Sequence, residues 1–387
     1  MTGPTEPIRY HALDSLRASM MLLGIILHAA LPYTTLRLGL YKDASTNPVF
    51  DAIAACIHYF RMPVFFVMAG FFGALLYKRR GLGGLVKNRL KRILVPLTVA
   101  FIFLSPFIHA GAAFASAATK SGSLVGGLHA AQQTSAWDPG IYHLWFLSDL
   151  LDFYFLVLVI TAAAGWFGAQ LRERLSNVFR LIVKSPWRFV ALAIPTFLAL
   201  WPTPLIPIGR ISIKTLVLMQ VAPFLFFGFG WLLYMHSDLV STFRRGAWWQ
   251  IALAVPLLLV AFIATRQTLL VAPDQKIVPQ LLAVGAQSLA VWLVVFGLTG
   301  LFLRYFDQAR PNIRYMSDAS YWMYLISLPL LQWIGGTLTI TTLPAALKFL
   351  LTLCLAMPIL LLSYHYCVRF TAIGAVLNGR KFPHHLP

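Results

Sequence analysis

The sequence is poor in charge, and acidic residues are especially scarce. Only 11% of its 387 residues are charged, and only 12 of them are Asp or Glu. Soluble domains carry about 25% charged residues, so an ordinary soluble fold is excluded. Hydrophobic residues make up 59% of the chain, and the mean hydropathy is +0.75. These values predict an all-α polytopic membrane protein, a bundle of transmembrane helices.

Several other features are missing. The three cysteines, Cys56, Cys354 and Cys367, fall in or beside apolar segments. This pattern excludes a disulfide framework and does not resemble a metal site, so we expect no metal. The apolar run after Leu16 has no small-residue cleavage site, which favours a first span over a cleaved signal peptide. Without repeats or a large extramembrane region, we expect one transmembrane domain over residues 1–387.

Apolar runs of about 17 to 25 residues predict ten spans. The expected spans are Ser15 to Thr34, Val49 to Tyr77, Ile93 to Phe114, Tyr142 to Gly168, Phe189 to Pro204, Lys214 to Met235, Ala247 to Thr265, Leu281 to Leu303, Ser317 to Gly335 and Leu343 to Val368.

The formal net charge of +19 would suggest nucleic acid as the partner of a soluble protein, but here the positive residues lie in short loops between spans. If the N-terminus is cytoplasmic, 22 Lys and Arg residues fall on the cytoplasmic side and seven on the other. This asymmetry predicts that both termini are cytoplasmic, that lipid surrounds the protein and that nucleic acid is not a partner. Only Arg61 and Lys348 are left inside spans.

The first span places three ionisable residues on one face. Arg17 and His28 are eleven positions apart, about 20° from three whole helical turns, and Asp14 precedes Arg17 by three. Ionisable residues inside a membrane usually have a function. In the alternative interpretation, Asp14 and Arg17 mark the helix entrance and His28 is a hydrogen-bonded packing residue.

The second span carries His58 and Arg61 at i and i+3, at a depth that can reach His28. The alternative is an internal charge held by backbone carbonyls for packing alone. Both interpretations place Arg61 away from lipid.

The fourth span opens with HLWFLSDLLDFY. His143 and Trp145 are expected at the outer interface, where Trp145 alone would be an ordinary belt residue. Asp149 and Asp152 follow at i and i+3, and a buried carboxylate there needs a partner such as Arg61 or a histidine. A histidine beside such a carboxylate gains the basicity that a general base needs.

The most basic loop, LYKRRGLGGLVKNRLKRILVPL, ends with Arg89 and Arg92 at i and i+3. Such a loop is normally a topology signal. Two neighbouring guanidinium groups also suit a polyphosphate, since each binds phosphate oxygens bidentately. The glycines nearby match neither a Walker loop nor a dinucleotide fingerprint.

Five motifs together resemble the membrane-bound acyltransferase-3 family, and within it the glucans biosynthesis protein C group, which transfers succinyl groups to periplasmic glucans. They are LDSLRASMMLLGIILHA, HYFRMPVFFVMAGFF, the Arg-x-x-Arg of NRLKRILVPL, HLWFL and SDASYWMYLISLP. They extend in order over nearly the whole chain. One departure is Ser327, where such proteins often have a histidine, so no role for a histidine there can be transferred to this chain.

The resemblance implies a multi-pass enzyme of the bacterial inner membrane that transfers an acyl group from cytoplasmic acyl-CoA, succinyl-CoA or acetyl-CoA, to a carbohydrate hydroxyl outside. We expect His28 to deprotonate that hydroxyl or to carry the acyl group itself, and Arg61 to stabilise the oxyanion or pair with Asp149. Arg17, Arg89 and Arg92 would hold the donor. Support or substrate contacts are expected from Asp14, His58, His143, Trp145 and Asp152.

Two alternatives remain at this point. The same chemistry could acetylate lipopolysaccharide, a capsule or another sugar. Intramembrane charges also mark transport pathways, so a transporter or flippase belongs to a second class. The acyl group, the acceptor, direct transfer against an acyl-histidine, and a homo-oligomeric state are left open.

Overall fold

The computed structural model describes residues 10–134, 140–166, 168–202, 213–379 and 382. All regular structure in these ranges is helical, as the composition predicts. The helices are α1 (His11–Ala30), α2 (Pro48–Arg89), α3 (Val95–Ser121), α4 (Leu124–Gln133), α5 (Trp145–Ala163), α6 (Ala169–Lys184), α7 (Arg188–Leu200), α8 (Ile213–Met235), α9 (Ala247–Leu270), α10 (Ile277–Tyr305), α11 (Pro311–Leu338), α12 (Ala345–Ser363) and α13 (Ala372–Asn378).

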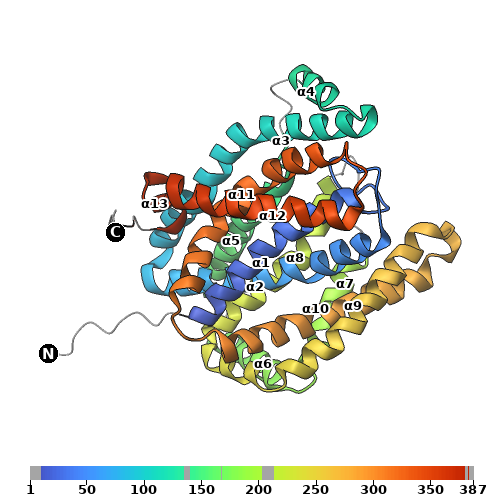
Figure 1. The fold of residues 1–387 in the computed structure, drawn as a ribbon. Coiled ribbons are helices and arrows are strands. Elements are labelled where there is room, and N and C mark those ends of the chain that lie inside the picture. Colours follow the sequence, from blue (N-terminus) through green and yellow to red (C-terminus); the bar gives the residue numbers. More distant parts are fainter. Residues whose placement is uncertain (1–9, 135–139, 167, 203–212, 380–381, 383–387) are drawn as a thin grey trace.

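The first helix, α1, lies in the middle of the bundle (Figure 1). It packs against α2, α10, α11 and α12, and 12 of its 20 residues are buried. Small or flexible residues such as Ala18, Met21 and Gly24 allow several helices to pack closely against α1 at once. The polar residues of α1 therefore face protein, which places them where a site can form.

The second helix is broken near one end. Gly81 has φ of 66° and ψ of −173°, a conformation that favours glycine, and it separates the apolar part of α2 from its basic end. A π-helical turn, η2 (Leu90–Leu94), then leads into α3. After this break, Asn88, Arg89 and Arg92 line the site described below.

Among the described residues, six helical segments are long and apolar enough to cross a membrane, or seven if the bent pair α6–α7 counts as one. The predicted spans 49–77 and 93–114 belong to a single segment, Pro48–Ser121. In α11, buried polar residues such as Ser320, Ser327 and Gln332 lower the hydropathy, so its predicted span at 317–335 is not among the six. The structure is that of a helical membrane protein, and the count of ten spans and the side of the termini stay predictions.

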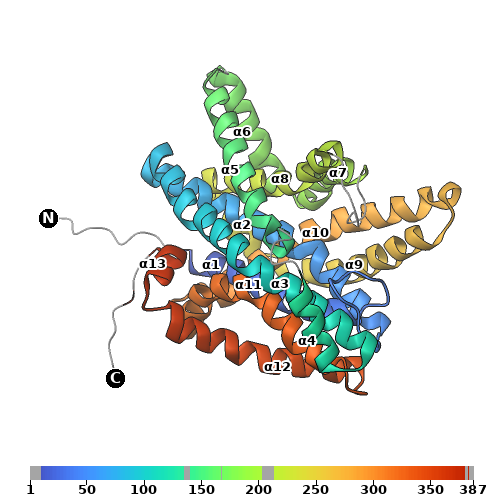
Figure 2. The ribbon, with the colours of Figure 1, turned by 90° about the horizontal axis from the view of Figure 1, so that it is seen from above.

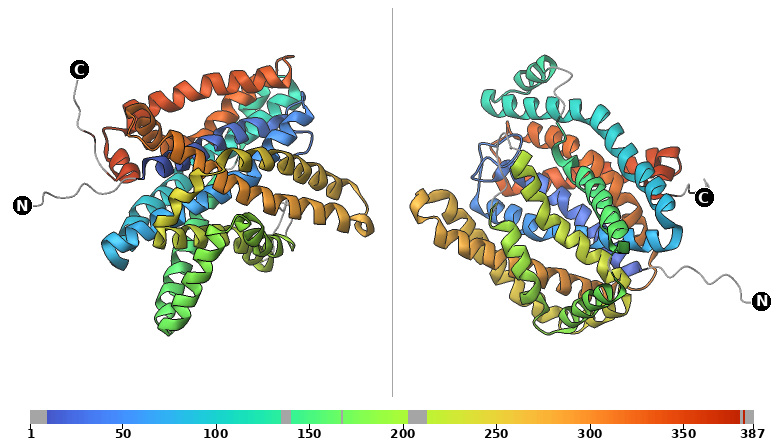
Figure 3. Two further views of the ribbon diagram at one scale, coloured as in Figure 1. Left: turned by 90° about the horizontal axis from the view of Figure 1, so that it is seen from below. Right: turned by 180° about the vertical axis from the view of Figure 1, so that it is seen from behind.

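Some elements stand apart from the central bundle. Figure 2 shows α6 projecting from the other helices, and Figure 3 shows α9 and α10 as a long hairpin at one side. Helix α6 is amphipathic, with Leu171, Leu175, Val178 and Leu181 exposed on it. Among the described residues, none from α6, α9 or α10 lines the site described below.

The loop between α1 and α2 is held firmly against α12. Lys348 donates from Nζ to both carboxylate oxygens of Asp43, at 2.9 and 3.1 Å, and both side chains are almost completely buried. The Ser45 hydroxyl accepts from the backbone N–H of Ala345 at 3.0 Å. This explains how a lysine is accommodated within the apolar helix α12, since its charge is neutralised there.

Candidate active site

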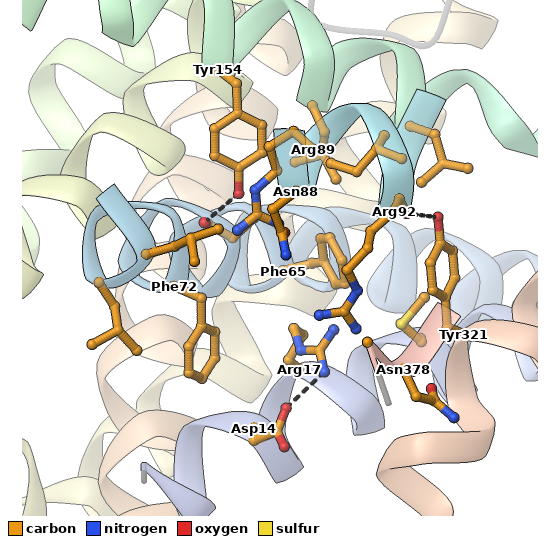
Figure 4. Close-up of a pocket in the computed structure, with 18 of the residues that line it drawn as sticks. Asp14, Arg17, Phe65, Phe72, Asn88, Arg89, Arg92, Tyr154, Tyr321 and Asn378 are labelled. Atoms are coloured by element: carbon orange, nitrogen blue, oxygen red, sulfur yellow. Dashed lines mark hydrogen bonds and ion pairs between the residues drawn. The ribbon is translucent and has the colours of Figure 1, made fainter. Parts of the chain in front are cut away.

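A cavity of about 440 Å³ opens at the end of the bundle where α1 begins and α13 lies. We call it the arginine cavity, because five arginines line it together with a few aromatic and amide side chains (Figure 4). The arginines are Arg17, Arg79, Arg80, Arg89 and Arg92. They come from α1, the basic end of α2 and η2, so the break at Gly81 is what brings them together.

Arg17 and Arg89 reach the cavity in different ways. Arg17 donates from Nη2 to Oδ1 of Asp14 at 2.7 Å, as the i and i+3 spacing predicts, and both side chains are partly exposed. The guanidinium of Arg89 lies over the ring of Tyr154, 4.5 Å from its centroid, while its Nε is buried without a hydrogen-bond partner. Both groups keep donors that an incoming anion can use.

Arg92 connects the cavity wall to the C-terminal helix. Its Nε and Nη2 donate to the backbone oxygen of Leu377 at 3.1 and 2.6 Å. The Tyr321 hydroxyl in turn donates to the backbone oxygen of Arg92 at 2.8 Å. Asn378 also lines the cavity, so α13 forms one of its walls. The three arginines that the sequence predicts to bind the acyl donor, Arg17, Arg89 and Arg92, thus line one cavity.

Further along α1 lies a second polar group, His28 with His58, Arg61 and His143, which we call the histidine cluster. The rings of His28 and His143 are 6.1 Å apart between centroids, and His28 is within electrostatic range of His58 and Arg61. Nε2 of His143 donates to the backbone oxygen of Leu325 at 3.1 Å, which leaves its buried Nδ1 without a partner. Residues from α1, α2 and η3 (Tyr142–Leu144) therefore converge, as the predicted depths of His28, His58 and Arg61 require. His143, which is expected at the outer interface, is instead buried beside His28.

Arg61 is the buried cation of this cluster, with only 6% of its surface exposed. Among the described residues it has no ion pair, and its Nε has no hydrogen-bond partner. Its guanidinium packs on Gly24, one turn before His28, where an added Cβ would lie 2.1 Å from Nη1. Glycine at position 24 thus allows Arg61 to approach α1 next to His28, and a larger residue there would displace the guanidinium.

Aromatic rings connect the two polar groups. Phe65 and Phe146 line the inner wall of the arginine cavity and pack edge to face, with their centroids 4.9 Å apart. Phe146 also packs on Tyr324 at 4.9 Å, and the Tyr324 hydroxyl donates to the backbone oxygen of His143. A series of aromatic contacts therefore runs from the cavity wall through Phe146 and Tyr324 to His143.

The predicted residues of α5 divide between core and surface. Asp149 is buried and accepts a hydrogen bond from Nε2 of Gln220 at 2.8 Å, so Arg61 is not its partner in this structure. Asp152 and Trp145 are exposed and lie outside both polar groups. The pairing of Arg61 with Asp149 is therefore not formed, which leaves the guanidinium of Arg61 available for another anion.

Sequence reasoning missed several residues of the site. Tyr154, Tyr321 and Asn378 line the arginine cavity but come from helices far apart in the chain, and each looks like an ordinary interfacial or packing residue. Arg79 and Arg80 were interpretable only as topology signals. No group of three or more His, Cys, Asp or Glu among the described residues could hold a metal ion.

Comparison with known proteins decides the family. A family model described as an acyltransferase domain matches residues 10–365, nearly the whole chain. The chain belongs to the acyltransferase-3 family. It is thus an acyltransferase and, with its apolar helices, a multi-pass membrane protein. The matched region contains both the arginine cavity and the histidine cluster, apart from the short wall made by α13.

The curated relatives agree with this assignment. Proteins named glucans biosynthesis protein C from Shigella dysenteriae serotype 1, Escherichia coli O139:H28 and Escherichia coli K12 are each 27% identical over 394 residues. The alignments cover 98% of this chain and 96% of each relative. No solved structure matches the chain.

Proposed function

We propose that this enzyme transfers an acyl group, with succinyl as the first candidate, from cytoplasmic acyl-CoA to hydroxyl groups of a glucan outside the inner membrane. The observation that carries the proposal is the arrangement along α1. Arg17 and His28 stand about 17 Å apart by helical rise, with the arginine cavity at one end and the histidine cluster at the other. The names of the relatives supply the glucan as acceptor.

The arginine cavity suits the donor. Its volume lies in the range of cofactor sites, and its guanidinium groups match the phosphates of CoA. The apolar wall made by Phe65, Phe146 and Leu150 would receive the arm that carries the thioester. The loops expected on the side of the bundle where the arginine cavity opens carry an excess of Lys and Arg. This excess supports a cavity that opens to the cytoplasm.

The histidine cluster suits the chemistry. His28 takes the proton of the attacking hydroxyl, and Arg61, which lacks an ion pair among the described residues, stabilises the oxyanion that forms at the thioester carbonyl. The new C–O bond forms as the C–S bond breaks and the electron pair moves to sulfur. The proton on His28 then passes to the thiolate. His143 and His58 frame the same space.

The test uses purified protein in proteoliposomes with succinyl-CoA, acetyl-CoA and a periplasmic glucan, and mass spectrometry of the product. His28→Ala should lower glucan acylation at least about 100-fold, the usual contribution of a general base, without weakening CoA binding. His129→Ala is the matched control, because His129 is exposed on α4 away from both polar groups.

The outcomes separate the alternatives. Preference for acetyl-CoA, or transfer only to another envelope sugar, would replace the succinyl-glucan assignment within the same enzyme class. Normal turnover by His28→Ala would remove His28 from the chemistry. A wild-type protein that binds no CoA would refute donor binding in the arginine cavity.

A further inference from the structure

A second, much smaller cavity lies beside His28. Its volume is about 10 Å³, and it is lined by His28, Tyr41, Gln332 and Thr352 together with apolar neighbours. Such a volume holds about one oxygen-sized group. The cavity borders α1, α11, α12 and the loop between α1 and α2, so it is distinct from the arginine cavity.

Gln332 is the unexplained residue of this cavity. It lies within α11, only 3% of its surface is exposed, and neither its Oε1 nor its Nε2 has a hydrogen-bond partner. Its neighbour Thr352 is satisfied, since Oγ1 donates to the backbone oxygen of Lys348 at 2.8 Å. A buried amide without partners destabilises the fold, and such groups usually meet a ligand or water.

We propose that Gln332 is the binding residue for the acceptor hydroxyl that His28 activates. A hydroxyl group has one donor and two acceptor positions, so it can donate to a ring nitrogen of His28 while accepting from Nε2 of Gln332. These two side chains border the same cavity, and its size admits one hydroxyl oxygen. The inference rests on the proposed function and adds to it the group that positions the nucleophile.

This placement defines what Gln332 contributes to the transfer. The hydroxyl oxygen attacks the thioester carbonyl carbon, forming the C–O bond while the C–S bond breaks and its electron pair leaves with sulfur. The hydroxyl proton moves to His28. Gln332 holds the oxygen while this proton leaves, so it acts on the acceptor and leaves donor binding unaffected.

Tyr41 closes the cavity on the loop side. It is 4% exposed, and its hydroxyl packs so closely on α11 that a Cβ at Gly335 would lie 2.1 Å from it. The Asp43–Lys348 ion pair holds the same loop two residues further on. A sugar ring is larger than the closed cavity, so the proposal requires the side chain of Tyr41 to rotate away when the acceptor hydroxyl enters, while the loop itself stays bound to α12.

The decisive experiment replaces Gln332 by the similarly sized apolar residues in Gln332→Met and Gln332→Leu. Acylation of a glucan from succinyl-CoA should lose about tenfold or more in kcat/KM for the glucan, the effect of one hydrogen bond to the substrate. CoA affinity should not change. Thermal stability should hold or rise, because a buried amide without partners is removed. A purely structural role would lower stability instead.

Gln250→Met is the matched control. Gln250 is also a buried helical glutamine, 2% exposed with an unpartnered Oε1, but it lies on α9 outside both cavities. It should transfer acyl groups normally.

Hydrolysis of succinyl-CoA without glucan distinguishes a sugar hydroxyl from water. If the Gln332 variants lose transfer and keep this hydrolysis, the acceptor assignment holds. An equal loss of both would show that Gln332 serves His28 rather than the sugar, and unchanged transfer would also overturn the inference. If the wild-type enzyme acylates no glucan, the proposed function itself fails. This outcome is seen without the variants, so the two failures can be told apart.

Discussion

The charged side chains of the arginine cavity and those of the histidine cluster differ in their exposure and in their ion pairing. In the cavity, Arg17 is partly exposed and paired with Asp14, and Arg92 donates to a backbone oxygen. In the cluster, Arg61 and His143 are only 6% and 4% exposed, and Arg61 forms no ion pair among the described residues. Exposed cations exchange water for phosphate at low cost, whereas a buried cation is kept ready for one charge that develops during the reaction. This difference supports our proposal that the donor binds at one end of α1 and that the chemistry takes place at the other.

The largest effect should come from removing the buried cation. Arg61→Met should lower kcat about 100-fold or more, as expected for the loss of an oxyanion-stabilising group, while the affinity for CoA stays within twofold. Steady-state acyl transfer and calorimetric CoA binding measure the two quantities. Arg188→Met, another buried arginine but one packed on Phe243 and Phe296, controls for loss of a buried guanidinium alone. A weakened CoA affinity in Arg61→Met would contradict the separation of the two regions.

A smaller effect should follow from displacing that cation without removing it. In Gly24→Ala the new methyl group would meet Nη1 of Arg61 at 2.1 Å, so the guanidinium must shift. We expect kcat to fall about tenfold, since a displacement of about 1 Å is enough to impair catalysis. Gly285→Ala is the control, because a Cβ there meets nothing within 4 Å on α10. Equal activity of the two variants would show that the position of Arg61 is not critical.

The smallest effect should come from a substitution in the arginine cavity, and it should appear in the affinity for CoA rather than in kcat. Arg89→Met should weaken CoA binding about tenfold or less and leave kcat nearly unchanged, because one charged hydrogen-bonding group is lost among several. The loss should shrink at high salt, where screening already weakens phosphate contacts. Titration of CoA at two ionic strengths measures this, with the exposed Arg172→Met as control. A fall in kcat alone would place Arg89 in the chemistry.

Much of this layout could be predicted from the sequence because it depends on local spacing. The three- and eleven-residue intervals of Asp14, Arg17 and His28 determine the Asp14–Arg17 pair and the common face of α1. Depth arguments place His28 together with His58 and Arg61. These relations follow from helical rise and rotation alone, whereas His143 is expected at the outer interface and is instead buried beside His28.

The remaining features depend on how helices rotate against one another. Asp149 and Asp152 are about 60° apart around α5, enough for one to be buried against Gln220 and the other exposed. Gln332 and Tyr321 resemble ordinary packing residues until the folded structure shows what surrounds them. No spacing rule predicts that α13 closes a cavity lined by α1.

The ion pair between Asp43 and Lys348 links opposite ends of the polypeptide. During synthesis, the loop that carries Asp43 is made some 300 residues before Lys348. Until that loop has docked, α12 carries an unneutralised ammonium group in an otherwise apolar segment, which opposes its stable insertion in lipid. We therefore expect stable insertion of α12, the last long helix, to depend on the docking of the loop between α1 and α2.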